Sequence, residues 1–297
     1  MTNDPFARLH PSIIFFYFVS VILFSMFFMH PIFQAIAFIS SFTYSIMLKG
    51  KKGVTFNLLY LMPMLLVMAI LNPAFNHQGV TILFYLKSGN PITLESILYG
   101  VAAAFMFITV ILWFSCYNAV MTSDKFIYLF GKIIPKLSLV FSMTLRFVPM
   151  YTEQLKEIAR AQEALGRGVA QGNVIQRAKN GMNILSMMTT WALENAVETA
   201  DSMNSRGYGL PGRTSFSIFR FDQRDKLMLL ALIGLDATIF IGAAMGENTI
   251  RFYPSITLAD LTLFSLAIYL AYFIFCVIPI LLHLQEAMKW KRIESSM

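Results

Sequence analysis

Long apolar stretches, separated by short polar ones, dominate the pattern of this chain. A helix needs about 20 mostly apolar residues to cross a bilayer. Six stretches approach or exceed this length: 12–29, 32–48, 54–71, 97–121, 227–245 and 261–282. The pattern therefore predicts an all-α polytopic membrane protein with about six transmembrane helices.

Composition agrees with this class of protein. Hydrophobic residues make up 57% and charged residues 13% of the 297 positions, whereas about 25% of the residues of a soluble domain are charged. An ordinary soluble globular protein is therefore excluded. Two cysteines inside apolar runs and four scattered histidines indicate neither a disulfide framework nor a metal site. The leading segment MTNDPFARLHP lacks a strongly basic region, so we expect no cleaved signal peptide.

Lysine and arginine lie almost entirely on one side of the predicted bundle. Six spans place both termini, the 49–52 loop and the 122–226 segment on the same side, which holds 21 of the 23 basic residues. The other side holds only Lys87 and Arg251. Because basic loops remain in the cytoplasm, we expect a multi-pass protein of the cell membrane with both termini in the cytoplasm.

Three parts follow from this topology, an N-terminal bundle of about four spans, a cytoplasmic domain of amphipathic helices, and two C-terminal spans with a basic tail: residues 1–121, 122–226 and 227–297. One stretch, 126–145, is apolar enough to resemble a further span. Lys132 and Lys136 near its centre would each cost about 2.5–3.5 kcal/mol in a bilayer. We therefore expect this stretch to form an interfacial or protein-covered helix.

The cytoplasmic segment contains two long amphipathic helices. Apolar residues such as Leu155 and Ile158 share one face at helical spacing, and charged residues occupy the others. Pro149 lacks a backbone donor and is expected to kink or restart the first helix beside Arg146. A glycine-rich stretch then ends this helix, and a second helix is expected over residues 174–206.

The two helices end in similar sequences. EIARAQEALGRG (157–168) aligns without gaps with ETADSMNSRGYG (198–209), and Leu165 falls on the position of Arg206. Each helix thus ends at a glycine that can adopt a positive φ. Arg206 is either a capping charge, worth about 0.3–1 kcal/mol at the negative end of the helix dipole, or part of a pair of tips that meet a cytoplasmic partner. The length of the cytoplasmic segment favours the second interpretation.

Three motifs in this order, RFVP (146–149), ARAQEALG (159–166) and SMNSRGYG (202–209), resemble the CbiQ-like family, the transmembrane T components of energy-coupling factor (ECF) transporters. The resemblance implies a non-catalytic scaffold of a prokaryotic importer for a vitamin or a metal ion. Its implied partners are two cytoplasmic ATPase subunits and a membrane-embedded substrate-binding S component. ATP and Mg are expected on the ATPases, since this chain has no P-loop, and no cofactor is expected here. Arg146 and Pro149 match the kink of the family.

The resemblance also assigns ATPase-coupling roles. The residues on the two coupling motifs are Ala164, Leu165, Gly166, Arg167, Ser205, Arg206 and Gly207. Ser205 replaces the alanine of the second motif, and Leu165 replaces the arginine of the first. Either Arg167 supplies the missing charge from a shifted position, or the first tip docks by apolar packing. The gapless alignment favours apolar packing.

Methionines gather in the predicted cytoplasmic helices: Met143, Met150, Met182, Met187 and Met188. Their flexible side chains suit either core packing or an adaptable apolar surface. The second interpretation, with the resemblance, makes them a possible surface for the S component.

Other functions stay open on the residues alone. A conventional ABC importer permease has one coupling loop, and EALGRGV begins like that loop but has Val169 where glycine is required. A membrane sensor or enzyme needs clustered His, Asp or Cys, and these are scattered. Asp236 in a predicted span is either hydrogen-bonded inside the bundle or involved in an ion pathway. Two matched tips favour the T component, whose transported substrate is bound by the S component and is not encoded here.

Overall fold

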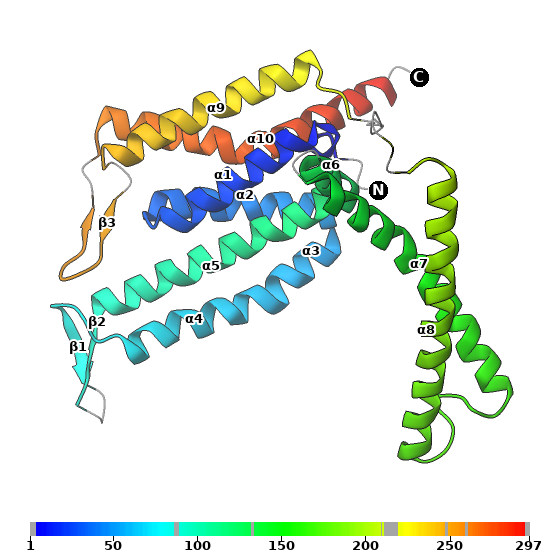
Figure 1. Ribbon diagram of the computed structural model, residues 1–297. Helices are drawn as coiled ribbons and strands as arrows, with labels where there is room; N and C mark the ends of the chain where they lie inside the picture. The colour runs from blue at the N-terminus through cyan, green and yellow to red at the C-terminus, as the bar shows by residue number, and fades with distance from the viewer. Residues whose placement is uncertain are drawn as a thin grey trace. The chain divides into compact units, whose positions relative to one another are not determined.

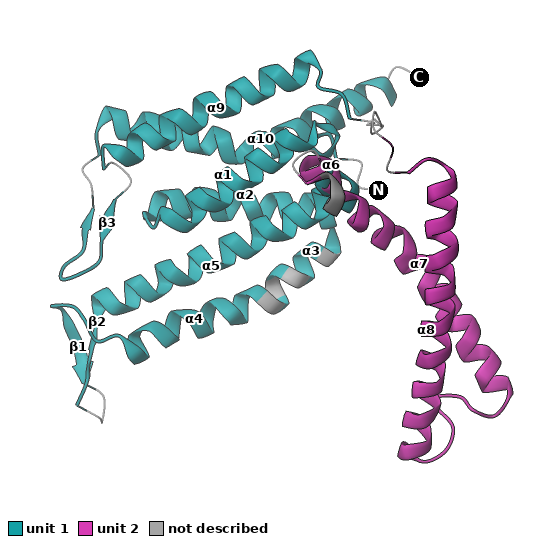
Figure 2. Cartoon of the chain, viewed as in Figure 1, with its two compact units in different colours: residues 1–126, 219–297 teal, residues 127–218 magenta. Residues whose placement is uncertain are grey.

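The computed structural model describes residues 4–85, 89–131, 134–208, 210, 219–246, 249–258 and 261–294. The chain forms two compact units, which Figure 2 colours separately. Unit 1 comprises Met1–Phe126 and Phe219–Met297, and unit 2 comprises Ile127–Ile218. Unit 2 is therefore an insertion in the chain of unit 1, and the predicted cytoplasmic domain encloses it.

Helices make up most of unit 1 (Figure 1): η1 (Phe6–Arg8), α1 (Pro11–Phe27), α2 (Pro31–Lys49), α3 (Lys51–Phe56), η2 (Asn57–Leu61), α4 (Met62–Phe75), α5 (Leu94–Val120), α9 (Gln223–Ala244) and α10 (Leu263–Glu294). Two short antiparallel hairpins connect α4 to α5 and α9 to α10: β1 (Ile82–Tyr85) with β2 (Pro91–Thr93), and β3 (Ile250–Arg251) with β4 (Thr257–Leu258). A short helix, α6 (Ser123–Gly131), leads from unit 1 into unit 2.

All six apolar stretches of the sequence are helical. α2, α5, α9 and α10 are each long and apolar enough to cross a membrane, while α1 and α4 are shorter apolar helices. The predicted helical membrane protein is confirmed. The third apolar stretch is divided by the π-helical turn η2, which ends at Leu61, two residues before Pro63 in the first turn of α4. Pro63 cannot donate to the carbonyl of Leu59, so a regular α-helical bond is lost at this turn.

Local sequence explains where several helices begin. Pro11 and Pro31 occupy the first turns of α1 and α2, where no backbone donor is needed. The hydroxyl of Thr93 accepts a hydrogen bond from a backbone N–H in the first turn of α5 at 3.3 Å. Asp222 and Asp225 form a capping box at the start of α9.

Aromatic side chains fill the centre of unit 1. Phe6, Tyr17 and Trp113 are fully buried. The ring of Tyr17 lies 5.0 Å from that of Phe6 and 6.0 Å from that of Trp113, both edge to face. Such pairs add about 0.5–1.5 kcal/mol to the burial of apolar area. Cys116 and Cys276 are buried and free, so both pack as small apolar side chains.

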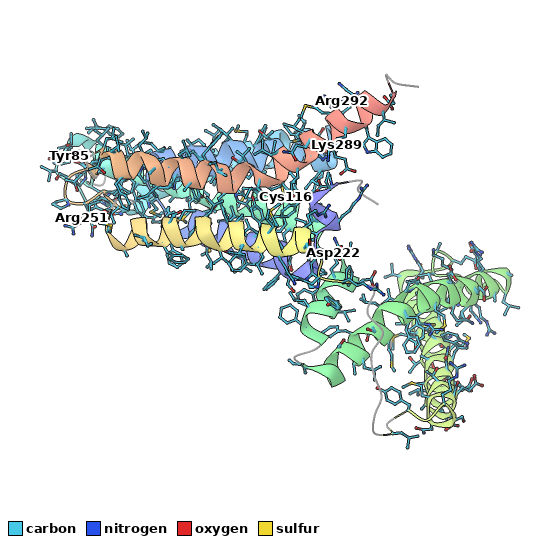
Figure 3. The ribbon with its side chains drawn as sticks, turned by 90° about the horizontal axis from the view of Figure 1, so that it is seen from above. Tyr85, Cys116, Asp222, Arg251, Lys289 and Arg292 are labelled. Carbon is cyan, nitrogen blue, oxygen red and sulfur yellow. The ribbon has the colours of Figure 1, made fainter. Side chains whose placement is uncertain are left out.

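The two ends of unit 1 carry different residues. Tyr85 and Arg251 lie at the end with the hairpins, and Lys289 and Arg292 lie at the opposite end (Figure 3). The start of the chain is also at this opposite end, because Arg8 forms an ion pair with α10. An even number of membrane spans requires the first and the last span to have their outer ends on the same side. Lys87, the other basic residue expected at the hairpin end, lies outside the described residues.

Unit 2 consists mainly of α7 (Pro135–Ala164) and α8 (Val174–Ser205), which cross in Figure 1. The ring of Tyr151 lies 5.4 Å from that of Trp191, and the Gln162 amide donates to the Met187 sulfur at 3.6 Å. In these contacts, the later residue of α7 meets the earlier residue of α8. The helices are therefore antiparallel, and the end of α7 lies near the start of α8.

One expectation for unit 2, a single helix over 126–145, is wrong, and of the kink or restart expected at Pro149 the structure excludes the restart. The 126–145 stretch is not one helix, since α6 ends at Gly131 and α7 begins at Pro135. Proline fits the first turn of a helix but breaks the bonds of one that would continue through it. α7 also runs on through Pro149 without a restart. Lys132 lies outside the described residues.

Candidate functional site: the ends of α7 and α8

α7 closes with a Schellman arrangement. The backbone N–H of Gly166 donates to the Glu163 carbonyl at 3.0 Å, and that of Arg167 donates to the Gln162 carbonyl at 2.8 Å. Gly166 has a φ of 73°, a left-handed conformation that glycine adopts without strain. Leu165 is thereby placed at the C-cap.

α8 closes in the same way. The backbone N–H of Gly207 donates to the Asn204 carbonyl at 3.0 Å, and that of Tyr208 donates to the Met203 carbonyl at 3.0 Å. Gly207 also has a φ of 73°. Arg206 is thereby placed at the C-cap, and the two closures together, residues 162–167 and 203–208, are here named the repeated cap.

The repeated cap makes Leu165 the structural equivalent of Arg206. Their φ and ψ angles are −84° and 6° for Leu165, and −86° and 10° for Arg206. The gapless alignment of the sequences is thus an equivalence of backbone positions. Arg167 corresponds instead to Tyr208, one position beyond the glycine.

Both tip side chains are open to solvent. Leu165 is 68% exposed, and Arg206 is also exposed. Within the described part of the chain, the Arg206 guanidinium makes no hydrogen bond or ion pair, so it does not bind the last carbonyls of its own helix. Ser205 differs, because its hydroxyl donates to the Asp201 carbonyl one turn earlier at 2.8 Å. Ala164, its counterpart on α7, is exposed.

The loop after the first tip is held by the first turns of α8. The amide of Asn180, which is buried, donates to the Gly168 carbonyl at 3.1 Å. The Arg177 guanidinium donates to the Val169 carbonyl at 2.9 Å. Sequence reasoning missed both residues, although polar side chains at i and i+3 just after a glycine-rich loop are a usable signal.

The two tips lie at opposite ends of the helix pair. α7 ends where α8 begins, and α8 has 32 residues, which corresponds to about 48 Å of helix. The tip at Leu165 and the tip at Arg206 are therefore about one helix length apart. A single small groove cannot bind both tips.

The RFVP motif, residues 146–149, lies within α7. Arg146 and Pro149 are both exposed. Pro149 leaves the Leu145 carbonyl without its usual helical donor, while the Thr152 hydroxyl donates to the Pro149 carbonyl at 2.6 Å. The motif thus weakens α7 locally without ending it.

The five methionines predicted to form a surface differ in their exposure and contacts. Met150 and Met187 accept hydrogen bonds from side-chain amides of the opposite helix at 3.9 and 3.6 Å. Met143 and Met188 are half-buried, and Met182 is 67% exposed. Packing between the helices therefore accounts for part of the set.

A larger exposed apolar surface lies on other residues. Phe141, Leu145 and Val148 are spaced along one face of α7 and are 55%, 42% and 53% exposed. Leu193 and Val197, spaced by four on α8, are 65% and 63% exposed. The i, i+4, i+7 spacing on α7 and the i, i+4 spacing on α8 are signals already present in the sequence.

The other polar candidates form no comparable site. The Ser20 hydroxyl donates to the Asp236 carboxylate at 2.8 Å, and Asp236 is buried inside unit 1. One oxygen of this acid is therefore hydrogen-bonded inside the bundle, as the first of its two interpretations expects. Among the described residues, no group of three or more His, Cys, Asp or Glu side chains could hold a metal ion.

Comparison with known proteins identifies the family of this chain. The family model CbiQ, described as a cobalt transport protein, matches residues 5–218, more than two thirds of the chain. The chain belongs to the CbiQ family. The resemblance to the transmembrane components of ECF transporters is therefore confirmed.

Curated relatives of this CbiQ-family chain are named energy-coupling factor transporter transmembrane protein EcfT. The protein from Leuconostoc gelidum subsp. gasicomitatum is 31% identical over 112 residues, 37% of this chain and 42% of the relative. The protein from Lactobacillus helveticus is 34% identical over 106 residues, 34% and 38% of the two chains. That from Streptococcus thermophilus is 32% identical over 106 residues, 35% and 40% of the two chains. Each alignment thus spans about two fifths of the relative.

Proposed function

We propose that this chain is the transmembrane scaffold of an ECF-type ABC importer. It couples two cytoplasmic ATPase subunits to a membrane-embedded substrate-binding S component, for uptake of a vitamin or a metal ion. The observation that carries this proposal is the repeated cap. Two helix ends with one backbone geometry, at opposite ends of one helix pair, suit binding to two similar subunits. ATP and Mg bind to those subunits, and this chain is not catalytic.

The two tips bind through different chemistry. The Arg206 guanidinium is a rigid fork of donors that pairs with carboxylates or carbonyls in a groove. Leu165 offers only apolar area, and full burial of such a side chain is worth about 1.5–3 kcal/mol. Because Leu165 rather than Arg167 takes the position of Arg206, we infer that the first tip docks by apolar packing.

The charge distribution supports the orientation. The Lys289 and Arg292 end of unit 1 is the cytoplasmic end, and the hairpin end with Arg251 faces outward. This assignment follows the excess of basic residues at cytoplasmic loops. It places unit 2, which connects to unit 1 beside this end, in the cell where ATP is available.

The S component binds along the exposed apolar residues of unit 2. The surface combines Phe141, Leu145 and Val148 on α7 with Leu193 and Met182 on α8. Apolar residues at helical spacing suit packing against another apolar helix, and a flexible methionine suits partners of different shape. The identity of the substrate then depends on the S component.

A conventional ABC permease is a poorer fit. Such a permease has a single coupling loop, whereas Gly166 and Gly207 close two helices with equal geometry. The membrane sensor or enzyme interpretation gains no support from the buried, hydrogen-bonded Asp236.

Charge reversal at the second tip tests the proposal. Arg206→Glu is expected to remove at least one ATPase subunit from the affinity-purified complex, because the new carboxylate faces the acceptors that bind the guanidinium. Subunits are identified and counted by mass spectrometry of the complex purified from cells that express the whole transporter. Lys156→Glu, an exposed charge reversal in the middle of α7, is the matched control and should leave the subunit count unchanged. Full retention of both ATPases by the Arg206→Glu chain contradicts the proposal.

A further inference from the structure

Most of the short segment before the first span is buried, although it contains three polar side chains. Asp4 is 2% exposed, Phe6 is fully buried, and Leu9 and His10 are 2% and 9% exposed. Residues 4–10, DPFARLH, therefore have contacts that need an explanation.

The first half of this segment is fixed to the bundle. The Asp4 carboxylate accepts a hydrogen bond from the Tyr44 hydroxyl at 2.6 Å, and its other oxygen lies 3.3 Å from Nδ1 of His283. Arg8 forms a 2.8 Å ion pair with Glu286. These contacts join the segment to α2 and α10.

The same segment holds the chain where it leaves unit 1 for unit 2. The Lys125 ammonium donates to the Ala7 carbonyl at 2.6 Å and to the Val120 carbonyl at 2.9 Å. Val120 is the last residue of α5, where helix carbonyls lack intrahelical donors and a cation is favourable. Burial lowers the pKa of the Lys125 ammonium below its ordinary value, and the Asp4 carboxylate acts in the opposite direction. Unit 1 ends one residue later, so residues 120–126 form the first connection.

The segment also holds the chain where it returns from unit 2. The His10 ring lies 4.9 Å from the Phe221 ring, edge to face, and the His10 N–H lies 3.5 Å from the Asp225 carboxylate. The other oxygen of Asp225 accepts from the Asp222 N–H at 3.2 Å and so caps α9. Residues 219–225 thus form the second connection, at the end of unit 1 that also carries Lys289 (Figure 3).

We propose that residues 4–10 are a common anchor that fixes both connections of the helical insertion to one place on the membrane bundle. Lys125 and Asp225 are its positioning residues. Each connection is short and includes non-helical residues, 121–122 in the first and 219–222 in the second. A force applied through α7 or α8 would be lost if either connection yielded. Because both bind the same buried segment, a displacement at one connection is resisted by contacts at the other. The anchor stands on contacts within unit 1, and only its role in transport rests on the proposed function.

Hydrogen–deuterium exchange of the full chain in lipid nanodiscs tests the anchor directly. Lys125→Met removes two hydrogen bonds, and we expect about fivefold faster exchange at residues 123–131 and also at residues 219–226, as expected for a loss near 1 kcal/mol. Faster exchange at the second connection is the decisive result, because among the described residues Lys125 makes no hydrogen bond or ion pair there. Lys125→Arg should restore slow exchange at both connections. Lys289→Met, an exposed lysine at the same end of unit 1, is the matched control and should change neither.

A second variant tests the link from the other side. Asp225→Asn weakens the contact with His10 while keeping an oxygen that can cap α9, and it should speed exchange at residues 123–131. The proposal of a common anchor would be wrong if each variant changed exchange only at its own connection. So would a failure of both variants to accumulate while Lys125→Arg accumulates normally, because the contacts would then serve folding alone.

The role in transport has its own readout. In the complex purified with its ATPases, Mg-ATP compared with Mg-ADP should change exchange in α5 and α9. Lys125→Met should keep ATP hydrolysis within about twofold and reduce this nucleotide-dependent change about fivefold. An unchanged response would overturn the role in transmission. Loss of the ATPases from the wild-type complex would instead contradict the proposed function and leave the exchange test of the anchor unaffected.

Discussion

Leu165 and Arg206 share a backbone position at the ends of two helices but differ in the chemistry that governs docking. The guanidinium requires acidic or carbonyl acceptors, while the leucine requires an apolar surface. A groove suited to one is poor for the other, because a buried polar group without a partner costs free energy. We therefore expect the two ATPase grooves to differ in their lining.

Leu165→Arg distinguishes an apolar first groove from an acidic one. An arginine in an apolar groove is desolvated without an acceptor, so we expect binding at the α7 tip to weaken about tenfold, equivalent to roughly 1.4 kcal/mol. Native mass spectrometry of the purified complex, titrated by dilution, measures the fraction that keeps two ATPase subunits. Leu165→Met keeps the tip apolar and should behave like the wild type. Tighter binding of the Leu165→Arg chain contradicts the apolar assignment.

The glycines of the repeated cap allow a test of stability. A residue with a side chain costs about 1–2 kcal/mol in the left-handed conformation of Gly166 and Gly207, both of which have a φ of 73°. A Cβ at Gly166 meets nothing within 4 Å, whereas a Cβ at Gly207 lies 3.0 Å from the Leu210 side chain. Alanine at either position should therefore lower the melting temperature of unit 2, and more at Gly207.

A third glycine is the matched control for these two variants. Gly181 lies inside α8 with an ordinary helical φ and open space around it. Gly181→Ala should stabilise the helix by about 0.5–1 kcal/mol, because alanine has the higher helix propensity. Thermal unfolding followed by circular dichroism in detergent gives the melting temperatures of all three variants. Equal changes in melting temperature at all three glycines would show that the positive φ of Gly166 and Gly207 does not cause the destabilisation.

At the scale of helices, the sequence predicted what depends on local pattern. The six apolar stretches and the end of the second long helix, expected at residue 206 and found at Ser205, follow from composition and glycine placement. The division of 126–145 into α6 and α7 was not predicted. The apolar character of the stretch favoured one helix, whereas Pro135 favours the start of a new helix. Contacts between distant residues, such as Asn180 with Gly168, depend on which helices meet, and no pattern along the chain specifies them.

Asn180 is predicted to control the order of the first tip. Asn180→Ala removes the side-chain donor to the Gly168 carbonyl, which keeps the Gln171 N–H at 3.1 Å. The expected cost is therefore that of one hydrogen bond, about 0.5–1.5 kcal/mol. Exchange should rise at residues 164–173 and stay unchanged at residues 203–208, because the second tip has no contact with Asn180. Asn183→Ala, an exposed asparagine one turn along α8, is the control. Equal loosening of both tips would mean that the helix pair melts as one element.

At the scale of the whole chain, function depends on the division between a membrane bundle and an inserted helix pair. The bundle packs aromatic residues around α1, and it presents few charged groups at its hairpin end. The insertion has long exposed apolar faces and two capped ends. A chain that combines an apolar bundle with a helix pair whose apolar faces are exposed agrees with a component of a multi-subunit transporter.

The orientation in the membrane can be settled with single cysteines. Cys116 and Cys276 are both buried, so they should stay unlabelled by a membrane-impermeant maleimide and need not be replaced. In intact cells, Tyr85→Cys at the hairpin end should be labelled at once, whereas Lys289→Cys should be labelled only after the membrane is permeabilised. The reason is the excess of basic residues at the Lys289 end, because such residues favour the cytoplasmic side of a membrane. Labelling of the Lys289→Cys chain in intact cells would put unit 2 outside, away from ATP, and would end the coupling proposal. Labelling of the Tyr85→Cys chain alone fixes the hairpins outside and leaves both tips of the repeated cap on the side where ATPases operate.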